Sequence, residues 1–410
     1  MALATKTTCP DCGDAPTNHF ASKSLILLDW VVSPVTNIFT RVWLKVERVI
    51  GPFIYDTLTP AIYRILAWLH FGTIIHEPDG KTSSRSLCLW QEAKRRGINM
   101  WEFRLFGLNR DLFVSKWPNN RSGKEITFDG LPLPGDFTPA ALAWMDDKGK
   151  IHKRFGVAGI PMAHYGEARK LGEAKGIFAK LRKPVITKPN IGSRSRHTFT
   201  HIENEEGFEK AYKSAKQLSP WVIVEEELVG MVHRATVIGG KLIGVLRRDP
   251  TSVIGDGVKT VRELIDIENT NPIRKGPIFH VIEYNSDLDA ELQRQNLTLE
   301  SVPSKDVTVI LSQKTSRGLG GGATDVTEVS HPDNNAVFEH IARVLDYPVV
   351  GIDFIIDDIS RSWKDETLCG VIECNSLPFI DLHVYPLIGK PRNTPGALWE
   401  LIYPGSSPRT

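Results

Sequence analysis

The order of apolar and polar positions along the chain predicts a mixed fold of helices and strands. A polar, periodically apolar segment at about 205–217 predicts a helix, and two adjacent glycines, Gly239 and Gly240, predict a hairpin turn between two strands. Short apolar runs that end in charged or amide residues predict buried strands at 184–188, 221–230, 351–358 and 371–375. Helices and strands that alternate in this way indicate a compact α/β or α+β protein.

Two of these predicted strands carry oxygen ligands. Asp353 lies inside the first, and Glu373 and Asn375 lie two residues apart in the second, so the latter pair points to one face. A carboxylate among buried apolar neighbours is costly unless a cation or hydrogen bonds stabilise it. Because magnesium prefers such hard oxygen ligands, the pattern predicts a magnesium site for a nucleotide. The alternative is a strand-edge carboxylate followed by ordinary turn residues.

The segment that ends in Lys188 has the features of a phosphate site. A basic turn follows this strand, and it contains Gly192, Ser193, Arg194 and Arg196. An ammonium group, loop amides and guanidinium groups can together bind phosphate oxygens. The alternative is a solvated basic hairpin.

The strand at 221–230 runs into carboxylates, and its backbone edge can meet an adenine. The hairpin at Gly239 and Gly240 returns Arg247 and Arg248 towards the same region. An ordinary antiparallel hairpin with a charged rim would look similar. The order of the elements, from the lysine strand to the ligand-bearing strands, nevertheless favours a nucleotide site.

Taken together, residues from about 146 to 404 resemble the ATP-grasp enzymes, and within them the ATP-grasp domain of cyanophycin synthetase. The matching stretches include PVITKP, VIVEEELVGMVHR, GIDFIIDDISRSW, VIECN and GKPRN. The resemblance implies an α+β fold in which two α/β subdomains clasp ATP. It also implies an ADP-forming carboxylate–amine ligase: ATP phosphorylates a carboxylate to an acylphosphate, and an amine then displaces phosphate to leave an amide.

The resemblance also implies roles for single residues. Lys148 and Lys188 match the two nucleotide-phosphate lysines of the family, and Glu225 matches the glutamate at the adenine edge. Ser193 and Arg196, in the turn after the second lysine, are expected to help bind the nucleotide.

The same comparison assigns the metal and the catalytic groups. Asp353, Glu373 and Asn375 match the magnesium ligands, with manganese as the alternative ion. Three arginines match positions near the phosphates, the acyl substrate or the intermediate: Arg234, Arg248 and Arg317.

The chain departs from the family pattern in several places. Ser195 and His197 stand where relatives have glycines, and Val232 stands where they have an acidic residue facing the ribose. Residues 376–383 replace a small glycine-bearing turn, which changes the expected acceptor pocket. Because both lysines and the metal ligands are present, we expect an active enzyme. The alternative is an ATP-binding pseudoenzyme or regulatory module with an altered phosphate loop.

Composition narrows the class of partner. The chain has 410 residues, 41% hydrophobic and 24% charged, with a formal net charge of +2, so no nucleic-acid partner is expected. We expect three parts: a helical arm at 1–80, a small α/β domain at 81–145 and the ATP-grasp domain at 146–410. Cyanophycin synthetases have a further Mur-ligase-like domain, for which no residues remain here. We therefore expect one kind of ligation, on amino-acid or peptide carboxylates and amines.

The N-terminal arm is rich in apolar and aromatic residues with basic residues between them. Asp29, Pro34 and Arg64 interrupt its apolar runs, so no transmembrane span is predicted, and the start does not look like a signal peptide. A helical hairpin packed on the body or on another subunit is the favoured interpretation, which allows a homo-oligomer. The alternative is an arm that lies in a membrane interface. The expected location is the cytoplasm, with membrane-peripheral contact as the alternative.

Cys9 and Cys12 form CPDC, half of a zinc-binding pattern, and His19 follows. A structural zinc site needs about four ligands. Of the other cysteines, Cys369 and Cys374 fall in the predicted ATP-grasp core. We therefore do not expect a closed zinc site within one chain, and the five cysteines suggest a reducing compartment without disulfides.

Overall fold

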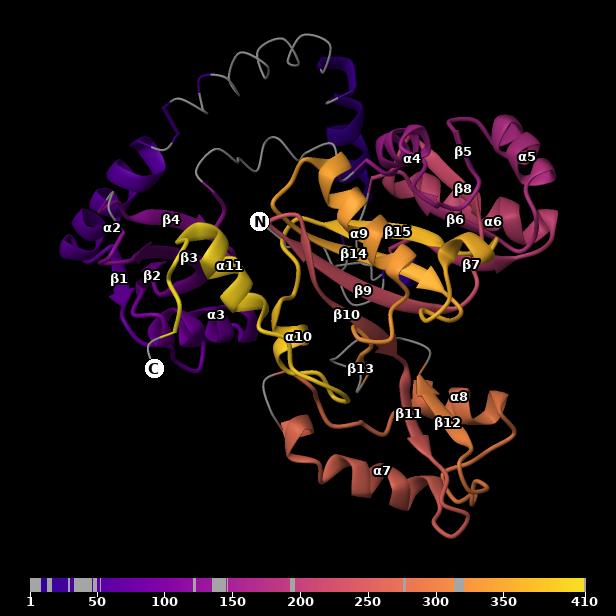
Figure 1. Cartoon of the computed structure of the whole chain (residues 1–410). Helices are drawn as coiled ribbons and strands as arrows, with labels where there is room; N and C mark the ends of the chain where they lie inside the picture. The colour runs from indigo at the N-terminus through magenta and orange to yellow at the C-terminus, as the bar shows by residue number, and fades with distance from the viewer. Residues whose placement is uncertain are drawn as a thin grey trace, which may run out of the picture. The chain divides into compact units, whose positions relative to one another are not determined.

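The computed structural model describes residues 9–12, 17–28, 30–32, 46, 50–51, 53–120, 123–134, 145, 147–191, 196–275, 278–312 and 321–408 (Figure 1). The chain forms two compact units. The first contains residues 1–51, 136–229 and 366–372, and the second contains residues 52–135, 230–365 and 373–410. Both units join residues from all three predicted parts, so the boundaries at 80 and 145 stay a prediction.

A four-stranded antiparallel sheet forms the centre of the first unit, in the order β5-β8-β6-β7. Its strands are β5 (Tyr165–Ala168), β6 (Val185–Pro189), β7 (Phe199–Ile202) and β8 (Val222–Glu226). Its helices are α4 (Lys148–Val157), α5 (Leu171–Lys180) and α6 (Glu205–Leu218). α6 begins at the predicted place because the Asn204 side chain caps it, accepting from the backbone N–H of Gly207. Its apolar face packs with α5 on the sheet, with Phe208 and Phe178 stacked.

The second unit contains a five-stranded sheet in the order β13-β10-β9-β14-β15. These strands are β9 (Met231–Ile238), β10 (Lys241–Asp249), β13 (Gly322–Asp325), β14 (Val349–Ile356) and β15 (Gly370–Asn375), of which residues 370–372 belong to the first unit. Gly239 and Gly240, both with positive φ, form the predicted turn between β9 and β10. Its helices are α9 (Pro332–Leu345), α10 (Asp381–Val384) and α11 (Thr394–Ile402). β14 is buried along nearly its whole length, as its apolar sequence predicts.

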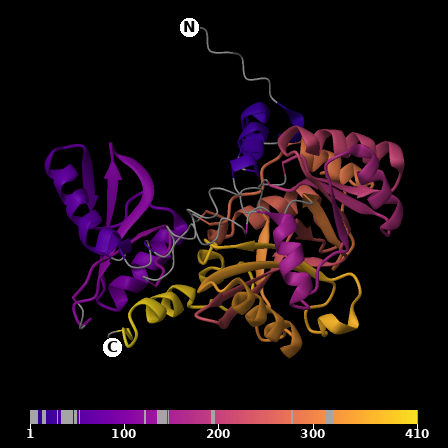
Figure 2. The ribbon, with the colours of Figure 1, turned by 90° about the horizontal axis from the view of Figure 1, so that it is seen from above.

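Two smaller sheets complete the second unit. β1 (Gly72–Ile75), β2 (Asn99–Leu105), β3 (Leu108–Lys116) and β4 (Ile126–Asp129) form an antiparallel sheet with α2 (Thr59–Trp68) and α3 (Ser84–Arg95) against it (Figure 2). β11 (Thr251–Ile254) and β12 (Thr308–Ser312) pair beside α7 (Val261–Asn269) and α8 (Ser286–Arg294). Short helical turns are η1 (Pro10–Cys12), η2 (Ile54–Leu58), η4 (Pro272–Lys275) and η6 (Trp363–Asp365). The mixed α+β class is confirmed.

The predicted helical arm at 1–80 is helical over much of its described part, but it also contains strand β1 (Gly72–Ile75), so the prediction of a purely helical arm was wrong for its last residues. Residues 19–28 and 30–32 are helical and belong to the first unit, where Trp30 and Trp221 pack together with Arg169 lying over both rings. α2 belongs to the second unit and stacks Tyr63 on Phe103. None of the helices described is both long and apolar enough to span a bilayer.

Candidate functional site

In the first unit, Lys188, Glu225 and His152 form a buried polar cluster. Lys188 and Glu225 lie on the neighbouring strands β6 and β8, two positions apart diagonally, because Lys188 is opposite Ile223. Lys188 Nζ lies 2.5 Å from Glu225 Oε1, and His152 Nε2 lies 3.2 Å from Glu225 Oε2. Tyr165 stacks on the His152 ring with centroids 3.8 Å apart. Two of the residues predicted to bind nucleotide, Lys188 and Glu225, are therefore in direct contact.

The Glu225 carboxylate is ionised in this cluster. Only 4% of the residue is exposed. Burial alone would raise the pKa of Glu225, but the Lys188 ammonium and the hydrogen bond from His152 outweigh it and lower the pKa to about 2. The cluster therefore holds a fixed negative charge beside a lysine ammonium.

Lys148 is linked to the Lys188 strand through Asn190. Lys148 is the first residue of α4, and its Nζ lies 3.4 Å from the Asn190 carbonyl oxygen. The Asn190 side chain accepts from the backbone N–H of Gly149 at 2.9 Å and donates to Glu167 at 2.8 Å. Because Asn190 closely follows Lys188, these bonds bring the segments of the two predicted phosphate lysines together.

The turn after Lys188 is described only in part. Arg196 is half-buried and directly precedes His197, which is 1% exposed. Ser193, predicted to bind nucleotide, and Ser195 lie outside the described residues.

In the second unit, Arg234 and Asp353 form a buried bidentate ion pair. They are directly opposite each other on β9 and β14. Arg234 Nε lies 2.5 Å from Asp353 Oδ1, and Arg234 Nη2 lies 2.7 Å from Asp353 Oδ2. Arg234 is 6% and Asp353 8% exposed. Hydrogen bonds thus stabilise this carboxylate, which is one of the two solutions that its burial required.

Glu373 and Asn375 lie on β15, the neighbour of β14 in the sheet. Glu373 is exposed and Asn375 half-buried. Burial lowers the pKa of Arg234, but Asp353, and to a smaller extent the charge of Glu373, outweigh it and raise the pKa above its usual range. The three predicted metal ligands therefore lie on two adjacent strands, and two of them, Asp353 and Glu373, act on the Arg234 guanidinium group.

Of the remaining residues singled out in the sequence, Arg248 and Val232 are described by the structure and Arg317 is not. Arg248 is half-buried on β10, two residues beyond Leu246, which lies opposite Arg234, so Arg248 and Arg234 share a face of the sheet. Val232 lies opposite Ile355 on β14. Arg317 lies outside the described residues.

Sequence reasoning missed several polar residues beside the predicted ones. His152 follows Lys148 by one helical turn, a spacing that could have revealed it. His383 lies in the segment that departs from the family pattern and is fully buried, with Nε2 2.8 Å from Thr236 Oγ1. Burial, and then the charge of Arg234, lower the pKa of His383 to about 3, so it is neutral. Its contact with Thr236, far away in sequence, gave no local signal.

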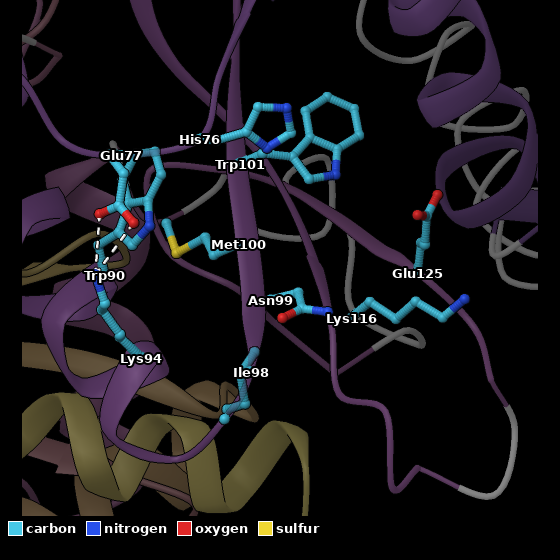
Figure 3. Close-up of a pocket in the computed structure, with 11 residues that line it drawn as sticks. His76, Glu77, Trp90, Lys94, Ile98, Asn99, Met100, Trp101, Lys116 and Glu125 are labelled. Carbon is cyan, nitrogen blue, oxygen red and sulfur yellow. Dashed lines mark hydrogen bonds and ion pairs between the residues drawn. The ribbon is translucent and has the colours of Figure 1, made fainter.

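A separate hollow of about 480 Å³ lies beside the β1–β4 sheet of the second unit (Figure 3). Glu77 and Lys94 form an ion pair at its edge, with Nζ–oxygen distances of 3.1 and 3.3 Å. The hollow contains none of the predicted site residues, and its lining includes Trp90, Met100 and Trp101. We assign no reaction to it.

The chain is similar to known proteins in both sequence and structure. No protein-family model matches the chain. It is 36% identical to a cyanophycin synthetase from Nostoc sp. over 225 residues, which cover 54% of this chain and 25% of that protein. It is 30% identical to the glutathione biosynthesis bifunctional protein GshAB of Pasteurella multocida over 269 residues, which cover 63% of this chain and 35% of that protein. The chain thus spans about a quarter to a third of the curated relatives it matches.

The crystal structure of a bifunctional glutathione synthetase from Pasteurella multocida is similar over 78% of this chain and 44% of that one, with a TM-score of 0.63 and 25% identity. The matched relatives and this structural neighbour are ATP-grasp ligases. The predicted resemblance to the ATP-grasp domain of cyanophycin synthetase is therefore confirmed, and the fold of this chain is that of the ATP-grasp ligases.

Proposed function

We propose that this chain is an ATP-dependent, ADP-forming carbon–nitrogen ligase that joins a carboxylate to an amine. The observation that carries the proposal is the buried Lys188–Glu225–His152 cluster, linked through Asn190 to Lys148. It puts a fixed carboxylate and two lysines on the strands and helix where the family resemblance assigns nucleotide binding. Relatives named for cyanophycin synthesis and for glutathione biosynthesis support amide-bond formation as the reaction class.

The proposed reaction has two steps. A carboxylate oxygen of the substrate attacks the γ-phosphorus of ATP, and the bond between this phosphorus and the oxygen bridging to the β-phosphate breaks. The products of this step are ADP and an acylphosphate. An amine then attacks the acyl carbon, the bond between this carbon and the phosphate oxygen breaks, and inorganic phosphate leaves with that oxygen while the proton lost by the amine passes to phosphate or water. Lys148 and Lys188 stabilise the phosphate oxygens, whose negative charge is spread in the transition state of the first step.

The second unit supplies groups that suit magnesium, with manganese as the alternative. Glu373 and Asn375 present a carboxylate and an amide oxygen two residues apart on one strand. Each Asp353 oxygen accepts from Arg234 and keeps a further lone pair for a cation. When bound, the metal would offset negative charge on phosphate oxygens. Arg234 orients Asp353, while Arg248 and Arg317 are proposed to bind the acyl substrate or its phosphate.

The substrates are proposed to be an amino acid or short peptide that supplies the carboxylate, and a second that supplies the amine. This class rests on the relatives named above. The buried His383 and its segment are proposed to shape the acceptor pocket, because this segment differs from the family pattern.

The test is an assay for ADP release by the purified chain across amino acids and short peptides, with and without magnesium. We expect sustained ADP release only when a suitable carboxylate and amine are both present with the metal, whereas the carboxylate alone should give no more than a single turnover. Glu373→Gln should reduce the rate by at least about 100-fold without lowering the melting temperature, because Glu373 is exposed. Glu283→Gln, at another exposed glutamate, is the control and should leave the rate unchanged. ATP binding without any substrate-dependent ADP would instead support the regulatory alternative.

A further inference from the structure

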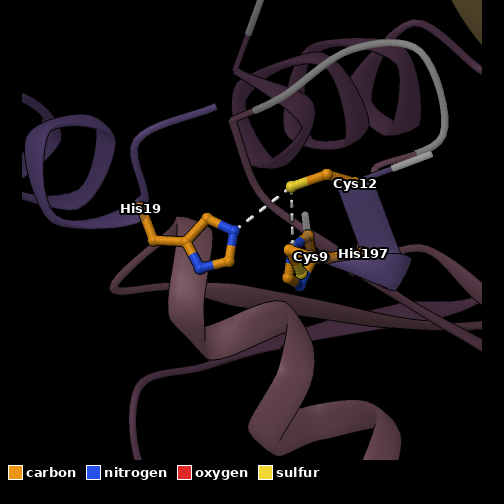
Figure 4. A group of neighbouring side chains, drawn as sticks. All are labelled: Cys9, Cys12, His19 and His197. Carbon is orange, nitrogen blue, oxygen red and sulfur yellow. Dashed lines mark hydrogen bonds between the residues drawn. The ribbon is translucent and has the colours of Figure 1, made fainter. Parts of the chain in front are cut away.

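Four side chains of the first unit converge beside the phosphate segment: Cys9, Cys12, His19 and His197 (Figure 4). Their ligand atoms all lie within 4.8 Å of one another. Cys12 Sγ lies 3.2 Å from His19 Nε2 and 3.4 Å from His197 Nε2, and Cys9 Sγ lies 3.6 Å from His197 Nε2. Cys9, Cys12 and His19 are close together in sequence, whereas the fourth residue, His197, comes from a distant part of the chain.

These separations fit a tetrahedral zinc site. Zinc binds sulfur at about 2.3 Å and nitrogen at about 2.0–2.1 Å, so the edges of its tetrahedron are roughly 3.3–3.8 Å long. The three short sulfur–nitrogen distances fall close to this range. Two cysteines and two histidines are also a ligand set that structural zinc sites use.

The hydrogen bonds around His197 prepare Nε2 to be a ligand. Its Nδ1 lies 2.9 Å from the Ser214 carbonyl oxygen, which can only accept. Nδ1 must therefore carry the proton in the neutral ring, and Nε2 presents its lone pair to the two sulfur atoms. His197 also adopts a positive φ of 51°, a conformation uncommon for residues other than glycine. Such a backbone persists only where surrounding contacts maintain it.

Hydrogen bonds also connect the CPDC turn to His197 and to Ser214 of α6. The Cys12 N–H donates to the Cys9 carbonyl at 3.1 Å, which closes the turn, and the His197 N–H donates to the Asp11 carbonyl at 2.9 Å. The Asp11 carboxylate accepts from the Ser214 hydroxyl at 2.5 Å. Cys12 and His197 are 3% and 1% exposed. The turn, the His197 backbone and α6 thus hold two of the four ligand side chains in a buried position, while Cys9 and His19 are half-buried.

We propose that Cys9, Cys12, His19 and His197 bind one structural zinc ion. Binding deprotonates the two thiols, so two protons are released and the two thiolates offset the charge of the metal. The ion links the N-terminal segment to the segment that follows Lys188. This site is separate from the magnesium ligands and does not depend on the proposed ligase activity.

The experiment uses the full chain, produced without a metal-binding tag in medium containing zinc and purified without chelator. Inductively coupled plasma mass spectrometry should find about one zinc per chain. Replacing the metal with cobalt should give visible absorption typical of tetrahedral thiolate coordination. The double variant Cys9→Ser with Cys12→Ser, and His197→Ala separately, should lose the zinc and the cobalt spectrum.

Two matched variants serve as controls. Cys88→Ser removes a buried thiol outside the cluster, and His201→Ala removes an exposed imidazole on β7, the strand that follows His197. Both variants should therefore keep the zinc. A wild-type chain with no zinc and no cobalt spectrum would overturn the proposal, as would a disulfide between Cys9 and Cys12. Zinc retained by the cysteine variant would place the metal elsewhere. If a variant misfolds, the zinc content and cobalt spectrum of the wild-type chain still test whether the site exists. None of these measurements requires ligase turnover.

Discussion

A single buried carboxylate, Glu225, connects the stability of the first unit to its proposed chemistry. Its charge is tolerated because Lys188 and His152 both contact it. Removal of one partner from a buried pair is costly, since the other charge is left without compensation. The same pairing keeps the Lys188 ammonium on a fixed strand position beside the proposed phosphate site.

The effect of Glu225→Gln on stability should depend on pH. Because the folded-state pKa of Glu225 is lowered to about 2 from 4.5, its ionised form stabilises the fold fully above the unfolded-state pKa. That contribution is lost as the pH falls towards 2. We expect the variant to lose about 3 kcal/mol of unfolding free energy at pH 7 and 5, with a smaller difference at pH 4 and 3 in urea titrations.

Glu206→Gln is the matched control for this comparison. Glu206 is an exposed glutamate whose partner Lys210 is also exposed. Its replacement should change the unfolding free energy by less than about 0.5 kcal/mol at neutral pH. A wild-type to Glu225→Gln difference that stayed constant down to pH 3 would contradict the assigned ionisation.

At the scale of elements, strand and helix positions were predictable where local pattern decides them. Asp353 falls inside β14, and the Gly239–Gly240 turn joins β9 to β10, because apolar runs and paired glycines act locally. Contacts between distant segments were not predictable. The sulfur of Cys12 and the ring of His197 are 185 residues apart in sequence, and nothing local to CPDC identifies its fourth partner.

Two exposed glycines should respond in opposite ways to the same change. Gly240 has φ of +77° in the hairpin, whereas Gly176 lies within α5, and a Cβ at either position meets no atom within 4 Å. Gly240→Ala should destabilise the fold by about 1 kcal/mol, because alanine is strained at positive φ. Gly176→Ala should stabilise it by up to about 1 kcal/mol, because alanine favours helix. Equal effects in thermal unfolding would show that the turn does not require glycine.

At the scale of the whole molecule, each unit carries its own part of the proposed chemistry. The first unit contains the lysines and Glu225, and the second contains Arg234, Asp353 and the β15 oxygens. The fold and the grouping of these residues within each unit could be inferred from the family resemblance, because each long matching motif contains both a strand and the candidate site residues on it. The substrates could not, because the segment around His383 and the loop of Arg317 differ from the family pattern or lie outside the described residues. Contact of the arm with a membrane or a second copy stays a prediction.

The most direct test of the central claim is calorimetric titration of ATP with magnesium into the purified chain, because it needs no knowledge of the substrates. The account predicts saturable binding of one ATP per chain. Lys188→Ala should weaken binding at least about tenfold, since a charge-assisted phosphate contact is lost. Lys180→Ala, at an exposed lysine at the end of α5, should bind ATP as the wild type does. Absence of ATP binding by the wild type, or equal affinity of the Lys188 variant, would contradict the account.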